Sequence, residues 1–508
     1  MSLALSAMLL LLNLALDGQS QPAERAYWPT HGWRTSSPEA QGMDSQVLAR
    51  AFDYVRVNHI PIHSLLIVKN GYVVLDAYFF PYRKGQLHDG ASMTKSVTSS
   101  LIGIAIQDRK LDGLHRPVLT LFPNRSIANR DERKEQMTVE DLLTMSSGLS
   151  CDPDHAEMTL QQMRQSADWV QFMLDQRMTS DPGDKFVYCS GGMHLLSGII
   201  SQVTGGSALE LARRELFGPL GIRNEIWPAD PNGVNYGWGD LHLQPQDWAK
   251  IGYLWLNQGR WEDRQILPPD WISEATEVHS HPARGDAVGY GYGFWLYPHR
   301  SPPEYEALGR GGQRITLTPA ENRIVVCTGG GFEPADIGKF IGESIKSSHA
   351  LPENPAAQTL LAGKVREATS PPEAESGSAG LAARCKTVSG KVYEMDANPL
   401  KLKSVSLVFA RPDEGTLRLE FAGGRVETRP MGLDGIPRLS RGGLGLPVAL
   451  LGRWTTDDTF EFDYDEAANI DSYRYRLTFD GNKVEVDVSE KTGLLGAVAN
   501  FRGNLRAR

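Results

Sequence analysis

The pattern of apolar and polar positions near the start of the chain predicts a helix, a β-hairpin and a second helix. Ser45 to Asn58 carries apolar residues at helical spacing on one side. From Ser64 to Phe79, two β-rich runs flank Asn70-Gly71, which is a strong hairpin signal. Ser92 to Asp108 is rich in Ser, Ile, Leu and Ala, and Lys95 is its only charge before the closing Asp-Arg-Lys, so a buried helix is expected.

The pattern continues with helices and ends in a second hairpin. Helices are predicted from Thr138, near 160–177, 193–204 and 209–216, from Pro245 to Gln258 and over 335–348. Ile315 to Pro319 and Ile324 to Thr328 form the second hairpin. Strands at both ends with helices between them predict an α/β (α+β) domain over residues 24–350. Its antiparallel sheet is closed by the terminal strands, is flanked by helices and carries an inserted helical region.

Composition changes after this domain. Residues 351–384 are rich in Pro, Ala, Glu, Ser and Gly, which is typical of a linker. Residues 385–508 contain short β-prone runs separated by turns, with Asp480-Gly481 between the last two. We therefore expect an all-β tail domain, either a small barrel or a sandwich.

The N-terminus and the cysteines bear on the compartment. The apolar run over residues 3–16 is too short to span a bilayer and fits a signal peptide of residues 1–23, although no Lys or Arg precedes Arg25. The expected location is secreted or periplasmic. A start codon placed too early or a disordered apolar tail is the alternative, and the protein is then cytoplasmic. The four cysteines are widely spaced and form no CxxC, so buried free thiols are the default expectation and no zinc site is indicated.

Composition and motifs exclude several classes of function. The 508 residues carry a net charge of −9 with no basic run, which argues against binding to nucleic acid. The chain has no GxSxG, no HExxH and no Walker A loop, and no GxGxxG follows a strand.

One catalytic signal remains, Ser92-Met-Thr-Lys95. A serine and a lysine at this spacing lie one helical turn apart on the same face. A lysine can take the proton of the hydroxyl if burial or a neighbouring cation lowers its pKa, and the apolar helix around Lys95 provides such burial. Alone, the motif also fits a surface pair.

Two further segments follow in order. Tyr188-Cys189-Ser190 offers a phenol that could share a proton with the pair, or simply a packed core tyrosine. Gly309-Arg310-Gly311-Gly312-Gln313 enters a predicted strand, where glycines let a ligand approach backbone N–H groups or merely make a turn.

Together these segments resemble the serine β-lactamase-like superfamily, closest to class C β-lactamases, family VIII carboxylesterases and 6-aminohexanoate-dimer hydrolases. The matching stretches are SMTKSVTSSLIGIAI, MTVEDLLTMSSGL, PGDKFVYCSGGMHLLSGII, LQPQDWAKIGYLWLNQGRW, YGYGFWLY and GRGGQRITLTP. The tail also resembles the β-rich appendage of some members.

The resemblance implies acyl transfer through a covalent acyl-enzyme. Ser92 matches the nucleophile, Lys95 its base and Tyr188 the proton shuttle. The N–H groups of Ser92 and Gln313 match the oxyanion hole, which is worth a few kcal/mol to the transition state. No metal or organic cofactor is implied, and the expected partner is a small-molecule ester or amide.

Two departures from the superfamily pattern concern the predicted substrate-binding residues, namely Ser190, Arg310, Gly311 and Gly312. Ser190 stands where many members have Asn, and Arg310-Gly-Gly stands where β-lactamases have Lys-Thr-Gly. Both changes favour an esterase or amidase. A β-lactamase or D-amino-acid peptidase, and a catalytically silent binding or sensor protein, remain the alternatives. Ser146-Ser-Gly148 and His194 are expected to be structural, and Asp240 and His242 receive no role.

Overall fold

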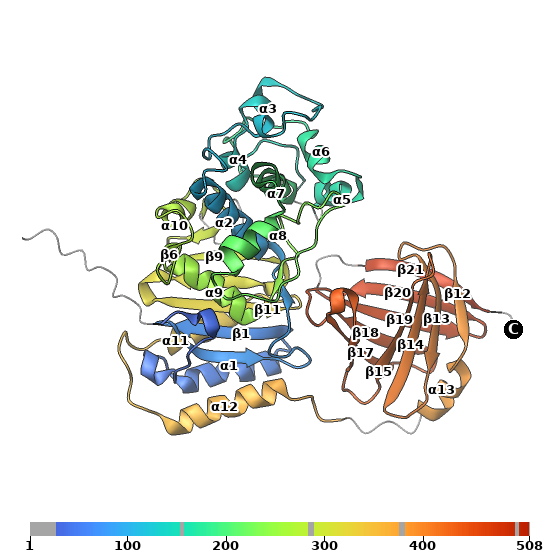
Figure 1. Cartoon of the computed structure of the whole chain (residues 1–508). Coiled ribbons are helices and arrows are strands. Elements are labelled where there is room, and N and C mark those ends of the chain that lie inside the picture. Colours follow the sequence, from blue (N-terminus) through green and yellow to red (C-terminus); the bar gives the residue numbers. More distant parts are fainter. Residues whose placement is uncertain (1–26, 153–156, 283–288, 375–380, 493–496, 507–508) are drawn as a thin grey trace, which may run out of the picture.

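The computed structural model describes residues 27–152, 157–282, 289–374, 381–492 and 497–506. The predicted signal peptide lies outside the described residues. A seven-stranded antiparallel sheet forms the centre of the N-terminal domain, in the order β2-β1-β11-β10-β9-β8-β7 (Figure 1). Its strands are β1 (Ile62–Lys69), β2 (Tyr72–Tyr78), β7 (Gly289–Tyr290), β8 (Trp295–Tyr297), β9 (Glu304–Leu308), β10 (Arg314–Thr318) and β11 (Arg323–Gly329).

Both predicted hairpins are present, and a strand of one pairs with a strand of the other within the sheet. Asn70 and Gly71 take positive φ values of 52° and 76°, as the tight turn between β1 and β2 requires. β1 then pairs with β11, so that Leu66 lies opposite Val326 although the two belong to opposite ends of the domain. The expectation of one sheet closed by its terminal strands is confirmed.

Strand β1, the second in the sheet, is buried on both faces, and its residues alternate between two cores. Leu65 and Ile67 face a core shared with α1 (Ser45–Val57), α11 (Ala335–Ser344) and α12 (Pro355–Thr369). Leu66 and Val68 face the larger core of α2 (Thr94–Gln107), α9 (Pro245–Leu256) and the inserted helical region. Figure 1 shows the first three helices on one side of the sheet and α9 on the other.

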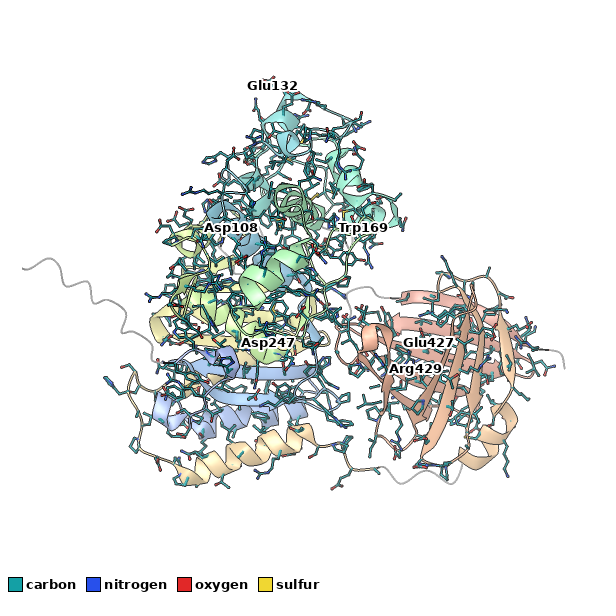
Figure 2. The ribbon with its side chains drawn as sticks, viewed as in Figure 1. Asp108, Glu132, Trp169, Asp247, Glu427 and Arg429 are labelled. Carbon is teal, nitrogen blue, oxygen red and sulfur yellow. A yellow bond between two sulfur atoms is a disulfide. The ribbon has the colours of Figure 1, made fainter. Side chains whose placement is uncertain are left out.

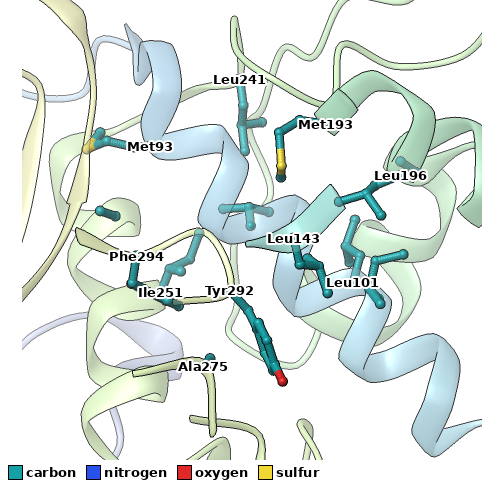
Figure 3. Close-up of a cluster of buried hydrophobic side chains, with 14 of the residues drawn as sticks. Met93, Leu101, Leu143, Met193, Leu196, Leu241, Ile251, Ala275, Tyr292 and Phe294 are labelled. Atoms are coloured by element: carbon teal, nitrogen blue, oxygen red, sulfur yellow. The ribbon is translucent and has the colours of Figure 1, made fainter. Parts of the chain in front are cut away.

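The inserted region packs against α2. Its helices are α3 (Glu132–Gln136), α4 (Val139–Leu143), α5 (Met158–Gln165), α6 (Trp169–Leu174), α7 (Ser190–Thr204), α8 (Ala208–Leu211) and α10 (Trp271–Ala275), with a π-turn over Ala212–Phe217. Two short antiparallel strand pairs are also present. β3 (His88–Asp89) pairs with β4 (His242–Leu243), and β5 (Arg260–Trp261) pairs with β6 (Arg264–Gln265). Figure 3 shows Leu101 of α2 among Leu143, Met193 and Leu196. The predicted capping at Thr138 is present, because its side chain and that of Asp141 form a capping box.

The predicted linker, residues 351–384, contains a long helix, which corrects that expectation. α12 begins with Pro355 in its first turn and Asn354 as its N-cap, whose side chain accepts from the N–H of Ala357. Buried Leu361 joins the core beneath the sheet, and Lys364 reaches Asp53 of α1 at 2.6 Å. Packing against α1 therefore orders a segment whose composition alone suggests a flexible connection.

The tail domain is a closed β-barrel. Nine strands form a ring, β15-β14-β13-β12-β21-β20-β19-β18-β17, because β15 meets β17, and β16 extends from β17. The elements are α13 (Leu381–Val388), β12 (Val392–Met395), β13 (Leu402–Val408), β14 (Glu414–Phe421), β15 (Val426–Gly432), β16 (Arg438–Arg441), β17 (Pro447–Trp454), β18 (Thr459–Asp465), β19 (Ser472–Asp480), β20 (Lys483–Glu490) and β21 (Ala497–Leu505). Figure 2 labels Glu427 and Arg429 of β15, which hydrogen-bond to each other at 3.0 Å.

Substitution of Gly103 in α2 compares the effect of tight packing on stability with the effect of helix propensity. A Cβ built on Gly103 would lie 2.7 Å from the ring of Trp271, whereas one on Gly338 of α11 would meet nothing within 4 Å. Gly103→Ala should therefore lower the free energy of unfolding by about 1–3 kcal/mol through overpacking. Gly338→Ala, the matched control, should raise it by about 0.5–1 kcal/mol through helix propensity. Thermal or urea unfolding of both variants measures the difference, and equal shifts of the same sign would contradict it.

Candidate active site

Ser92 and Lys95 lie at the N-terminal end of α2, and their side chains touch. Ser92 belongs to the 3₁₀ turn Ala91–Met93, and Lys95 follows on the first turn of the helix. The Nζ of Lys95 donates to the Oγ of Ser92 at 2.7 Å and to the carbonyl of Trp238 at 2.9 Å. Lys95 is only 1% exposed. The structure thus places the Ser92 hydroxyl and a buried amine at hydrogen-bond distance.

The backbone before Ser92 is held in an unusual conformation. Ala91 has a positive φ of 45°, which is uncommon for a residue with a side chain. The carboxylate of Asp89 accepts from the N–H of Ala91 at 2.7 Å, and a Cβ on Gly90 would lie 2.2 Å from Trp248. Such strain persists only where the surroundings enforce it, and it is concentrated at functional sites.

Tyr188 lies against the same lysine. The Nζ of Lys95 is 4.8 Å from the centre of the Tyr188 ring, which stacks on Trp295 at 6.0 Å. The structure therefore brings together all three predicted catalytic residues. Trp238 and Trp295 complete the surroundings. Trp295 belongs to the matching stretch YGYGFWLY, whereas no sequence motif had indicated Trp238.

A disulfide joins Cys189, the neighbour of Tyr188, to Cys151. The expectation of buried free thiols is thus wrong for this pair, whereas Cys327 and Cys385 are buried and free. Thirty-eight residues separate the two bonded cysteines along the chain, so their pairing depends on how the helical region folds. The bond ties the Tyr188 segment to the loop that follows α4.

The segment Gly309–Gln313 lies beside the turn that carries Ser92. A Cβ on Gly309 would be 2.6 Å from the carbonyl of Gly90 and 3.1 Å from Ala91. The side-chain amide of Gln313 is fully buried and bridges this segment to β11, because it donates to the carbonyl of Gly329 at 2.6 Å and accepts from the N–H of Gly329 at 3.1 Å. Among the described residues no backbone carbonyl takes the N–H of Gln313. This arrangement suits the predicted oxyanion hole.

Arg310 finds its charge partner in the tail domain. Its Nη1 lies 2.9 Å from the Oδ1 of Asp471, in the loop between β18 and β19. Burial opposes the charged form of Arg310, but the Asp471 carboxylate outweighs it and raises the pKa of the guanidinium. The role of Arg310 in binding a substrate stays a prediction.

The two glycines and the serine predicted to bind substrate lie in restricted places. Gly311 and Gly312 have φ values of 78° and 93°, and a Cβ on Gly312 would lie 2.5 Å from Phe332. Packing alone therefore requires Gly312. Ser190 begins α7 and is 3% exposed, and its Oγ has no hydrogen-bond partner within the described part of the chain.

Other polar residues have structural partners. His194 is buried, as expected, and its Nε2 lies 3.2 Å from Asp230. Burial opposes ionisation of Asp230, but its hydrogen bonds to His194 and to backbone N–H groups lower the pKa. Gly148 has a φ of 75° in the predicted turn. Asp240 and His242, which received no role from the sequence, line a cavity together with Asp89.

Comparisons with known proteins identify the family of the chain. The Beta-lactamase family profile matches residues 48–342, more than half of the 508 residues. The protein belongs to the Beta-lactamase family, whose fold its antiparallel sheet and flanking helices display.

Individual relatives are distant. Protein flp of Staphylococcus aureus (strain MW2) is 27% identical over 177 residues, which cover 33% of this chain and 34% of that protein. The chain thus spans about a third of the length of this relative. An octameric penicillin-binding protein homologue from Pyrococcus abyssi is 18% identical with a TM-score of 0.48, covering 90% of this chain and 99% of that one. A family VIII carboxylesterase is 15% identical with a TM-score of 0.47, covering 66% and 98%.

Neither a metal cluster nor a membrane helix is found in the part of the chain that the structure describes. No three His, Cys, Asp or Glu side chains there are grouped to hold a metal ion. No helix there combines the length and hydropathy needed to cross a bilayer.

The disulfide predicts a specific alkylation pattern and a loss of stability. Denatured, unreduced protein should take up iodoacetamide only at Cys327 and Cys385, and reduced protein at all four cysteines, as read by intact mass. In the native protein burial raises the pKa of Cys327 to about 12, so its thiol should stay unlabelled. The double variant Cys151→Ser/Cys189→Ser should lose about 2–4 kcal/mol of stability. Four labelled cysteines without a reductant would contradict the pairing.

Proposed function

We propose that the protein is a serine hydrolase that cleaves carboxylic esters or small amides through an acyl-enzyme on Ser92. The observation that carries the proposal is the 2.7 Å contact between the Oγ of Ser92 and the Nζ of Lys95, which is 1% exposed. A hydroxyl becomes an effective nucleophile when a positioned base takes its proton. Buried at this distance, Lys95 is suited to that task.

The proton path uses the three side chains in turn. Neutral Lys95 accepts the proton of Ser92 while Oγ bonds to the substrate carbonyl carbon, and the electron pair of the C=O bond moves to oxygen. When that pair returns, the bond to the alcohol or amine breaks, Tyr188 gives its proton to the leaving group, and Lys95 passes the proton from Ser92 to the Tyr188 oxygen. The position of its ring 4.8 Å from Nζ supports this role. Water then attacks the acyl-enzyme by the reverse transfers.

The developing oxyanion needs fixed donors. We assign this role to the backbone N–H groups of Ser92 and Gln313. The buried Gln313 amide holds its own segment against β11, so the donor is positioned before substrate arrives. Preorganised donors of this kind stabilise the transition state because they do not have to reorient during the reaction.

Uncharged esters and amides fit this cleft better than β-lactams, whose carboxylate needs a free cation. Arg310 is the cation of the Gly309–Gln313 segment, and it already faces Asp471 at 2.9 Å. A β-lactam carboxylate would have to compete with that side chain.

We also propose that the enzyme acts outside the cytosol, secreted or in the periplasm. The disulfide between Cys151 and Cys189 supports this location, because disulfides persist mainly in oxidising compartments.

Labelling and kinetics test the mechanism. A fluorophosphonate should add one label to the wild type and none to Ser92→Ala, as read by intact mass. Lys95→Ala should lower kcat for p-nitrophenyl butyrate by about 10²–10⁴ because the general base is lost. Ser99→Ala is the matched control, since Ser99 is buried on the same helix and its Oγ has no partner among the described residues. Its labelling and kcat should stay close to those of the wild type. Equal labelling of Ser92→Ala would overturn the proposal.

A further inference from the structure

The barrel reaches the candidate active site through the segment Glu466–Asp471, between β18 and β19. Three of its residues are almost fully buried, Ala467 at 0%, Ala468 at 1% and Ile470 at 1%. The N–H of Asp89, close to Ser92, donates to the carbonyl of Ala468 at 3.0 Å. Ala468 also packs on Tyr78 and Tyr82 of the catalytic domain. This segment is therefore fixed against the turn that carries the nucleophile.

The same segment packs on Gly311 of the Gly309–Gln313 segment, and another part of the barrel packs on Gly331. A Cβ on Gly311 would lie 2.3 Å from Ile470, and one on Gly331 would lie 2.5 Å from Thr492, also in the barrel. Arg310, beside Gly311, pairs with Asp471 at 2.9 Å. The barrel thus provides Ile470, which packs on Gly311. It also provides Asp471, which pairs with Arg310, the only cation of the Gly309–Gln313 segment.

The walls of the cavity between the two domains carry more acidic than basic side chains. It has a volume of about 270 Å³, and its walls include Asp89 and Asp240 of the catalytic domain and Glu466 and Asp471 of the barrel. Arg310 and Arg164 are the cations of its wall, and Arg310 is already paired. A substrate carboxylate entering here meets more negative than positive charge, and at short range in a partly buried site that repulsion is weakly screened.

We propose that the barrel is a specificity element of the hydrolase, in which Asp471 neutralises Arg310 and so excludes substrates that carry a carboxylate. This inference rests on the proposed function and adds the barrel as the source of its preference for uncharged esters and amides. Arg310 lines this cavity, and its side chain is 39% exposed even when paired. Removal of the Asp471 charge leaves that cation free to accept an anionic substrate.

The experiment compares full-length variants on two matched substrates, p-nitrophenyl butyrate and the hemiester p-nitrophenyl glutarate, which adds a carboxylate. Asp471→Asn should raise the ratio of kcat/KM for the charged over the neutral ester by about three- to tenfold, since partly exposed ion pairs are weak. Asp471→Glu should keep the wild-type ratio. Adding Arg310→Gln to Asp471→Asn should remove the gain, because the freed cation is then gone.

Two further variants distinguish a failure of the specificity proposal from a failure of the proposed function. Asp487→Asn removes the same charge from β20, where Asp487 faces Asn500 of β21, and should leave the ratio unchanged. Ser92→Ala shows whether turnover depends on the proposed nucleophile. If Ser92 is required but Asp471→Asn leaves the ratio as in the wild type, the specificity role is overturned and the hydrolase proposal stands. Turnover that survives Ser92→Ala overturns both.

Discussion

Pairing between β1 and β11 is the constraint on which the rest of the structure depends. It joins the two ends of the catalytic domain, with Leu66 opposite Val326. Because β1 is covered on both faces, its alternate residues must each enter a core, and a slip of one residue would exchange the two faces. The register is therefore fixed, and β10 beside β11 brings the Gly309–Gln313 segment to the N-terminal end of α2. The candidate site is a consequence of that register.

A buried lysine requires hydrogen-bond partners for its amine. Removing an ammonium group from water is costly unless it is hydrogen-bonded, and Lys95 is bonded by Ser92 and the carbonyl of Trp238 and lies over the face of Tyr188. These contacts come from α2, from the loop before β4 and from the N-terminal side of α7. The same contacts that make the burial of Lys95 tolerable also bring Ser92, Lys95 and Tyr188 together.

The barrel packs against the domain that carries the candidate site. It is joined to the catalytic domain through α12, which packs on α1, and it returns to the site through the β18–β19 segment. A closed barrel has no free sheet edges except at its added strand, and the contacts of Ala468, Ile470 and Asp471 with the other domain come from a loop. Loops can change in sequence without unsettling the strands, which makes a barrel a suitable support for residues that tune a neighbouring cleft.

The sequence by itself determined the elements whose signals are local. Apolar residues at Val484, Val486 and Val488 alternate as a strand with one buried face, and Asn70-Gly71 marks a turn that needs positive φ. Ser92 and Lys95 meet because residues three apart on a helix share one face. Tyr188 and Gln313 were found only because their surrounding motifs resemble a family, since nothing local makes either residue approach Ser92.

Tertiary structure decided what joins distant parts of the chain. The pairing of Cys151 with Cys189, the ordering of α12 against α1 and the contact between Arg310 and Asp471 all depend on packing between elements far apart in sequence. Composition marked α12 as linker because its helix is stabilised mainly by the surface it covers, which the local sequence does not contain. For the same reason the charge at Arg310 looked available in the sequence and is balanced in the fold.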